Sequence, residues 1–161
     1  MKVNKLLLLE SVYRFINKFI IIEMQLLYYS SYLGFILVFT SIYYSFILYA
    51  IIYLTGTLTS LNYWKDPTSY MNRYIDIMCI WFLAIYFTYL AFINNIYTYL
   101  YYVILESTLY ILELIIEKTL LMKTDKYIAN LPNKIHFLLH LLCIPYNVYL
   151  LDKLYLIATI K

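Results

Sequence analysis

This chain contains a long stretch without any charged residue. The 41 residues from Met24 to Trp64 contain no Asp, Glu, Lys, Arg or His. An uncharged apolar run of about 18 or more residues is typical of a membrane-spanning segment. As one straight helix the run would be about 60 Å long, whereas a hydrocarbon core is about 30 Å thick. The run is therefore too long for one perpendicular span and barely long enough for two.

Glycine and proline are scarce as well, with two and three copies in 161 residues. Turns are therefore weakly marked, and long helices are favoured. A membrane β-barrel would need alternating polar and apolar residues with frequent turns, which the unbroken apolar runs do not provide. We predict an all-α, multi-pass transmembrane helix bundle.

The composition excludes other classes of protein. Charged residues make up 13% of the chain, about half the usual share in soluble domains, and mean hydropathy is +0.75. Such a chain needs lipid, or other membrane subunits, around it. The net charge of +3 is spread over short segments and forms no patch of the kind that binds nucleic acid. The expected partners are the lipid bilayer and other membrane subunits, and no nucleic acid.

Tyrosine is abundant, with 22 copies. Its ring and hydroxyl suit membrane interfaces, but Tyr, Ile, Phe, Asn and Lys also share AT-rich codons. Such a bias is typical of organelle genomes and large DNA viruses. We predict an integral membrane protein, located either in a viral or host membrane or in the mitochondrial inner membrane. The two cysteines, Cys79 and Cys143, form no CxxC pair and are expected to be free thiols.

The chain divides into two regions. Residues 1–25 are predicted to form an amphipathic helix at the membrane interface, because Glu10, Arg14 and Lys18 share one helix face. Residues 26–161 form the transmembrane domain, in which residues 26–63 hold one span or two. Two spans would require a turn near Tyr43–Phe46. The other predicted spans are residues 74–93, 96–116 and 135–151, separated by a loop at 65–69, a turn at 94–95 and a connection at 117–134.

The distribution of basic residues favours five spans over four. With two spans in residues 26–63, ten basic residues lie on one side of the membrane and only Lys153 and Lys161 lie on the other. Cytoplasmic loops collect Lys and Arg, so the five-span arrangement fits this rule better.

Few charged residues lie within the spans, and each is a candidate for function because charge is costly there. We predict that Asp76 pairs with Arg73, three residues back on the same helix face. Glu106 lies mid-span, where it faces a bundle partner or lines a conduction path. Glu113 is expected at the interface. Glu117 has no basic residue three or four positions later and is expected to face solvent or lipid headgroups.

The two histidines, His136 and His140, are four residues apart and share a helix face. This spacing is used to bind one metal ion with two imidazoles, and Asp76 or Glu106 could supply a third ligand. The alternative is that His136 lies at the interface and His140 bonds to a neighbouring helix. We expect no cofactor and no tight zinc binding, with zinc as the alternative.

The order Ser60, Asp76, His136-xxx-His140 resembles the Ser-xxx-His, Asp, His-xxx-His pattern of the alkaline ceramidase and adiponectin-receptor superfamily of membrane hydrolases. The resemblance implies a zinc site at His136, His140 and Asp76, with Ser60 and Asp76 assisting the hydrolytic water. Trp64 stands where the first histidine should be, and that superfamily has seven spans, so this chain resembles a shortened, degenerate relative. Its composition also resembles that of small multi-pass membrane proteins of giant DNA viruses.

Three functions follow as alternatives. The first is a non-catalytic, structural membrane component, and the second is a metal-dependent hydrolase of a lipid amide. The third is a transporter or channel component in which Glu106 and Asp76 line the path. Convergence of His136, His140 and Asp76 would favour the hydrolase. A polar cavity that holds Glu106 without that convergence would favour transport.

Overall fold

The computed structural model describes residues 25–67, 69–121 and 131–160, and almost all of them are helical. This described part contains no β-strand, so the predicted all-α bundle is confirmed. The amphipathic helix predicted for residues 1–25 lies outside the described residues, except for its last position.

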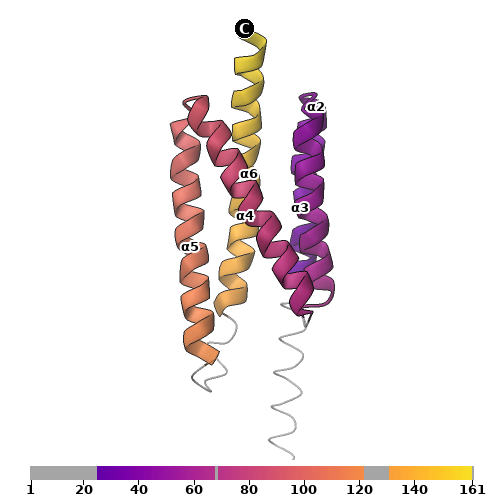
Figure 1. Cartoon of the computed structure of the whole chain (residues 1–161), viewed down its shortest axis with the longest axis vertical. Coiled ribbons are helices and arrows are strands. Elements are labelled where there is room, and N and C mark those ends of the chain that lie inside the picture. The colour runs from indigo at the N-terminus through magenta and orange to yellow at the C-terminus, as the bar shows by residue number, and fades with distance from the viewer. Residues whose placement is uncertain (1–24, 68, 122–130, 161) are drawn as a thin grey trace, which may run out of the picture.

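The described helices run up and down the bundle in turn, and neighbours in sequence are antiparallel (Figure 1). Residues 25–31 are helical and lead, through a turn at 32–33, into the first complete helix. The helices that follow are α2 (Gly34–Tyr43), α3 (Ile47–Lys65), α4 (Tyr70–Ile93), α5 (Tyr97–Leu121) and α6 (Leu131–Ile160).

Two tight turns at the upper end in Figure 1 join α2 to α3 and α4 to α5. Ser45 and Asn95 adopt φ values of 63° and 59°, in the left-handed region. In each turn the amide of the next residue donates to the carbonyl five residues back. The Phe46 amide donates to Ser41 at 2.8 Å, and the Ile96 amide donates to Ala91 at 2.9 Å. This is the Schellman geometry that usually ends a helix at glycine. Residues 26–63 therefore form two antiparallel helices, as the five-span alternative predicts.

Four described segments are long and apolar enough to cross a membrane, namely residues 25–43, 70–93, 97–119 and 132–160. The chain is thus built as a multi-pass integral membrane protein. The remaining helix, α3, runs antiparallel to its neighbours but carries Thr, Ser and Gly along much of its length. Its small and polar residues such as Gly56, Thr57 and Ser60 are buried between its neighbours, whereas Leu48 and Ile51 are exposed.

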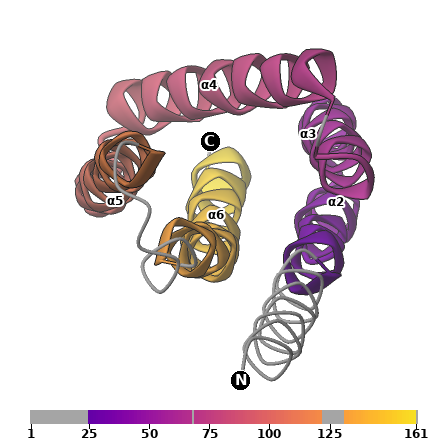
Figure 2. The ribbon, with the colours of Figure 1, turned by 90° about the horizontal axis from the view of Figure 1, so that it is seen from below.

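α6 occupies the centre of the fold, and the helices from α2 to α5 form an arc around it (Figure 2). Its residues Leu150 and Leu151 are fully buried in the main apolar core, together with Phe87 of α4. The ring of Tyr53 in α3 stacks on Phe87 at 4.6 Å. Apolar contacts from α3, α4 and α6 thus close the upper half of the bundle.

Small residues let the arc helices approach closely. A Cβ atom added to Gly34 would collide with the Thr57 side chain of α3, and one added to Gly56 would meet Leu83 of α4. Glycine at such contacts is common between membrane helices, because association there depends on close packing.

The predicted helix boundaries need one main correction. The last span was predicted to end at residue 151, but α6 continues through Asp152 and Lys153 to Ile160. The Tyr44 hydroxyl donates to the Asp152 carboxylate at 3.1 Å, and Tyr155 stacks on the Tyr44 ring at 4.8 Å. These contacts fix the helix extension against the α2–α3 turn. Burial, and then the bond to Asp152, raise the pKa of the Tyr44 hydroxyl.

Candidate functional site

A partly open cavity of about 360 Å³ lies between the helices and extends from the lower end of the bundle to its middle. Residues from all five helices line it, together with Ser30 and Ser31 from the segment before α2. Its volume falls in the range of small-molecule binding sites, about 300–1,000 Å³. The residues predicted as a catalytic or metal site, Ser60, Asp76, His136 and His140, all line this cavity.

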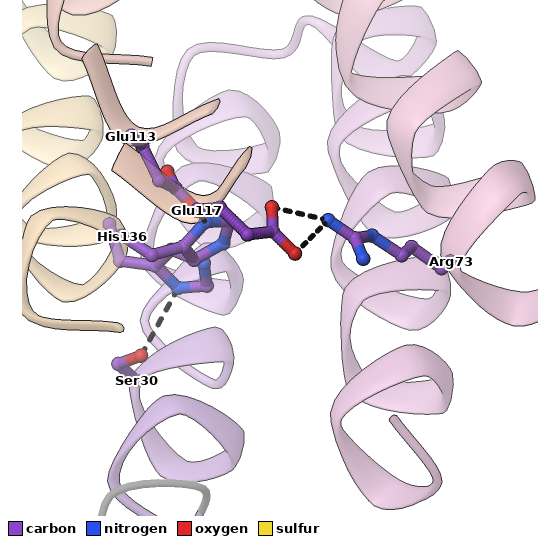
Figure 3. Close-up of polar contacts among 6 residues, drawn as sticks. Ser30, Arg73, Glu113, Glu117 and His136 are labelled. Atoms are coloured by element: carbon purple, nitrogen blue, oxygen red, sulfur yellow. Dashed lines mark hydrogen bonds and ion pairs between the residues drawn. The ribbon is translucent and has the colours of Figure 1, made fainter. Parts of the chain in front are cut away.

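An ion pair joins α4 to α5 at the lower end of the cavity (Figure 3). The Arg73 guanidinium donates to both carboxylate oxygens of Glu117, at 2.8 and 2.9 Å. Two predictions are therefore wrong: Arg73 pairs across the bundle and not with Asp76, and Glu117 does not face solvent alone. Figure 1 shows that α4 and α5 meet at the upper turn and diverge downwards, so this pair bridges their widest separation.

A second acid–base contact lies beside the first. His136 Nδ1 lies 3.0 Å from a carboxylate oxygen of Glu113, which is buried by the neighbouring helices; its place at the membrane interface stays a prediction. The Trp64 ring packs edge-on against His136, with ring centroids 5.1 Å apart. The Trp64 indole N–H is buried and has no hydrogen-bond partner among the described residues, so it is available to an acceptor inside the cavity.

The remaining polar contacts hold the histidine and the serines to neighbouring helices. His140 Nδ1 lies 3.2 Å from the Ser30 hydroxyl, as expected for a histidine that bonds to another helix. Ser31 lies 3.5 Å from Ser60. Asp76 is buried and accepts a hydrogen bond from Thr59 at 3.1 Å.

These contacts bear on the metal hypothesis. The rings of His136 and His140 are neighbours, with centroids 5.0 Å apart. Their Nδ1 atoms engage Glu113 and Ser30, respectively. Across the described residues, no group of three or more His, Cys, Asp or Glu side chains is placed to hold one metal ion. The zinc site and the catalytic roles of Ser60 and Asp76 stay predictions, and the convergence that would favour a hydrolase is not found in this part of the chain.

Glu106 is the third carboxylate on the cavity-lining face of α5, after Glu117 and Glu113. It lies about 10 Å from Glu113 along the helix, at about 1.5 Å per residue. In the part of the chain that the structure describes, Glu106 has neither a hydrogen bond nor an ion pair. The cavity thus leads from two paired carboxylates near the lower end to one unpaired carboxylate near the middle of the bundle.

A hydrogen-bonded cluster that is not among the predicted site residues closes the upper end of the cavity. The Asn147 side-chain oxygen accepts from the hydroxyls of Tyr53, at 2.8 Å, and Tyr99, at 3.1 Å. The Asn147 amide donates to the Cys143 carbonyl at 2.8 Å. This cluster joins α3 and α5 to α6. A lone asparagine in an apolar run is the signal that could have found it, because an unpaired amide is costly in a membrane bundle.

The charge balance of the cavity indicates what it can bind. Glu117 and Glu113 each have a basic partner, Arg73 and His136, respectively. Asp76 has hydroxyl partners and Glu106 has none. Glu106 is partly buried, and a carboxylate held away from water without a partner is stabilised by binding a cation or a proton. The site is therefore suited to cations.

Comparison of the chain with protein-family models, with curated proteins and with solved structures finds no match.

Proposed function

We propose that this protein is a transport component of a membrane and that Glu106 binds the transported cation inside the bundle. The observation that carries the proposal is the Glu106 carboxylate, which lines a partly open cavity and has no partner among the described residues. A carboxylate at this depth is costly unless a cation or proton neutralises it, and such residues mark ion pathways in membrane proteins.

The arrangement of the other charges supports the same proposal. Glu117 and Glu113 lie on the same face of α5 as Glu106, so a cation entering from the lower end passes acidic side chains in sequence. Arg73 forms an ion pair with the first of these, and His136 contacts the second. Release of the Arg73–Glu117 pair would open the lower end, since this pair joins the diverging ends of α4 and α5.

Cation flux into proteoliposomes containing the purified full chain tests the proposal. With a membrane potential imposed, we expect uptake by the wild type of protons or of a monovalent cation, either inorganic or an organic ammonium ion. Glu106→Gln should abolish this uptake. Asp152→Asn is the matched control, because an amide oxygen can still accept the Tyr44 hydroxyl and Asp152 does not line the cavity. Equal flux in Glu106→Gln and wild type would refute the role of Glu106.

A second candidate is a non-catalytic structural subunit of a membrane complex in a viral, host or mitochondrial inner membrane. The observation that favours it is the outer surface, where large apolar side chains such as Phe39, Tyr43 and Ile85 are more than 60% exposed. Such a surface suits lipid or the helices of another subunit. Chemical crosslinking in native membranes, followed by mass measurement, would detect stable partners, whereas a monomer with Glu106-dependent flux would favour transport.

A further inference from the structure

The cavity that contains Glu106 is much larger than a metal ion or a proton requires. Its volume of about 360 Å³ is about ten times the volume that one water molecule occupies in the liquid, about 30 Å³. A site for a bare inorganic cation is compact and offers several oxygen ligands at short range. The size of the cavity therefore points to a ligand with a body of its own.

The walls near Glu106 are mainly apolar, although Ser107 and Tyr99 also line the cavity there. One turn away on α5, Val103 and Tyr110 line the cavity on either side of Glu106. On α4, at about the same distance from the α4–α5 turn, the lining residues are Ala84 and Phe87. These side chains offer few of the oxygen ligands that an inorganic cation needs, but they can contact a hydrocarbon group.

Aromatic rings add a second means of holding a cation. Tyr110 lies four residues after Glu106 on the same helix face, and Trp81 packs edge-on against Tyr110 at 6.2 Å between centroids. Rings in such a wall attract organic ammonium groups through their negatively charged faces. A carboxylate beside aromatic rings can therefore hold an ammonium ligand both by charge and by contact with the rings.

Two basic side chains that line the cavity are engaged by carboxylates other than Glu106. Arg73 is bound to Glu117, and His136 is bound to Glu113. We infer that the ligand of the Glu106 cavity is a protonated amine with an apolar body, whose ammonium group pairs with Glu106 while its hydrocarbon part contacts the wall of α4. This inference rests on the proposed function for the same cavity and names its ligand class.

The chain carries a natural reporter for this inference. Both of its tryptophans, Trp64 and Trp81, line the cavity. Tryptophan fluorescence of the full chain in phosphatidylcholine nanodiscs can therefore be titrated with n-hexylammonium, which is protonated at pH 7 as a lysine side chain is. Hexan-1-ol supplies the same apolar body without charge, and K⁺ supplies the charge without the body.

We expect a saturable fluorescence change with hexylammonium that hexan-1-ol and K⁺ reproduce only at concentrations at least about tenfold higher, which corresponds to about 1.4 kcal/mol. Glu106→Gln should weaken hexylammonium binding by at least about tenfold, whereas Asp152→Asn should leave it unchanged. Equal affinity for hexan-1-ol, or equal affinity of Glu106→Gln for hexylammonium, would overturn the inference.

A variant that keeps the charge guards against a folding defect in Glu106→Gln. Glu106→Asp retains the carboxylate on a shorter side chain, and it should still prefer hexylammonium to hexan-1-ol. Loss of that preference in a folded Glu106→Asp protein would count against the inference. Binding of hexylammonium without any flux would refute the proposed function alone. Glu106-dependent flux of protons or K⁺ without hexylammonium binding would refute this inference alone.

Discussion

Replacement of Asn147 by leucine is expected to destabilise the bundle through the two tyrosine hydroxyls that it leaves behind. Tyr53, Tyr99 and Asn147 are each at most 5% exposed, so water has little access to replace the lost acceptor. Measured side-chain hydrogen bonds in a membrane bundle average about 0.6 kcal/mol and reach about 1.7 kcal/mol. Two lost bonds therefore predict a decrease of about 1–3 kcal/mol in the free energy of unfolding.

The assay is reversible unfolding of the purified chain in mixed micelles, followed by circular dichroism at increasing dodecyl sulfate. The triple variant Asn147→Leu/Tyr53→Phe/Tyr99→Phe should recover most of the loss, because removal of both partners leaves no buried group unsatisfied. Tyr53→Phe also preserves the stacking of this ring on Phe87.

Tyr102→Phe provides a matched control. Tyr102 stacks on Tyr146 at 5.6 Å, is 41% exposed and does not bond to Asn147. This variant should unfold like the wild type. The reasoning fails if Asn147→Leu unfolds like the wild type, or if the triple variant is no more stable than Asn147→Leu.

Three further predictions concern helix contacts and one exposed end of the bundle. Gly34→Ala should cost about 1–3 kcal/mol by overpacking against Thr57, and adding Thr57→Ala should restore stability in the same unfolding assay. Arg73→Gln should cost only about 0.2–1 kcal/mol, because Arg73 and Glu117 are partly exposed, but it should raise flux at the lower end. The raised pKa of Tyr44 favours its neutral form in the folded state, so its stabilising contribution is complete below the unfolded pKa of about 10 and is lost as the pH rises through the folded pKa. Tyr44→Phe should therefore reduce the loss of stability seen by circular dichroism between pH 9 and pH 12, whereas an unchanged alkaline profile would contradict this assignment.

The helices could be predicted because charge and polar dipeptides mark their limits. Asn94-Asn95 lies at the turn between α4 and α5, and Ser69 caps α4 by accepting from the Asn72 amide at 3.3 Å. The reversal at Ser45 was one of two open alternatives, because no glycine marks it. The structure shows that Ser45 ends α2 in the left-handed conformation, with the hydrogen bond from Phe46 to Ser41 that is typical of a Schellman motif.

The pairing of charges could not be predicted from spacing along one helix. The sequence offers Asp76 as the nearest acid on the same face as Arg73, but the guanidinium reaches Glu117 on α5, 44 residues later. Thr59 and its helix provide Asp76 with a different partner. These pairings depend on the tilt of α4 and on the distances between the helices of the arc. Neither produces a periodic pattern in the sequence. The position of Glu106 mid-span was predictable, whereas its isolation from other charges was not.

The central place of α6 has a consequence for biosynthesis. Among the described helices α6 comes last along the chain, yet it contacts both α2 and α5 and supplies Leu150 and Leu151 to the core. During translation the four earlier helices must therefore wait in the bilayer as an incomplete arc, with Tyr53 and Tyr99 lacking their acceptor. Ribosomal release of α6 then closes the fold in a single late step. A chain stalled before residue 131 would consequently expose polar groups to lipid and become a substrate for membrane quality control.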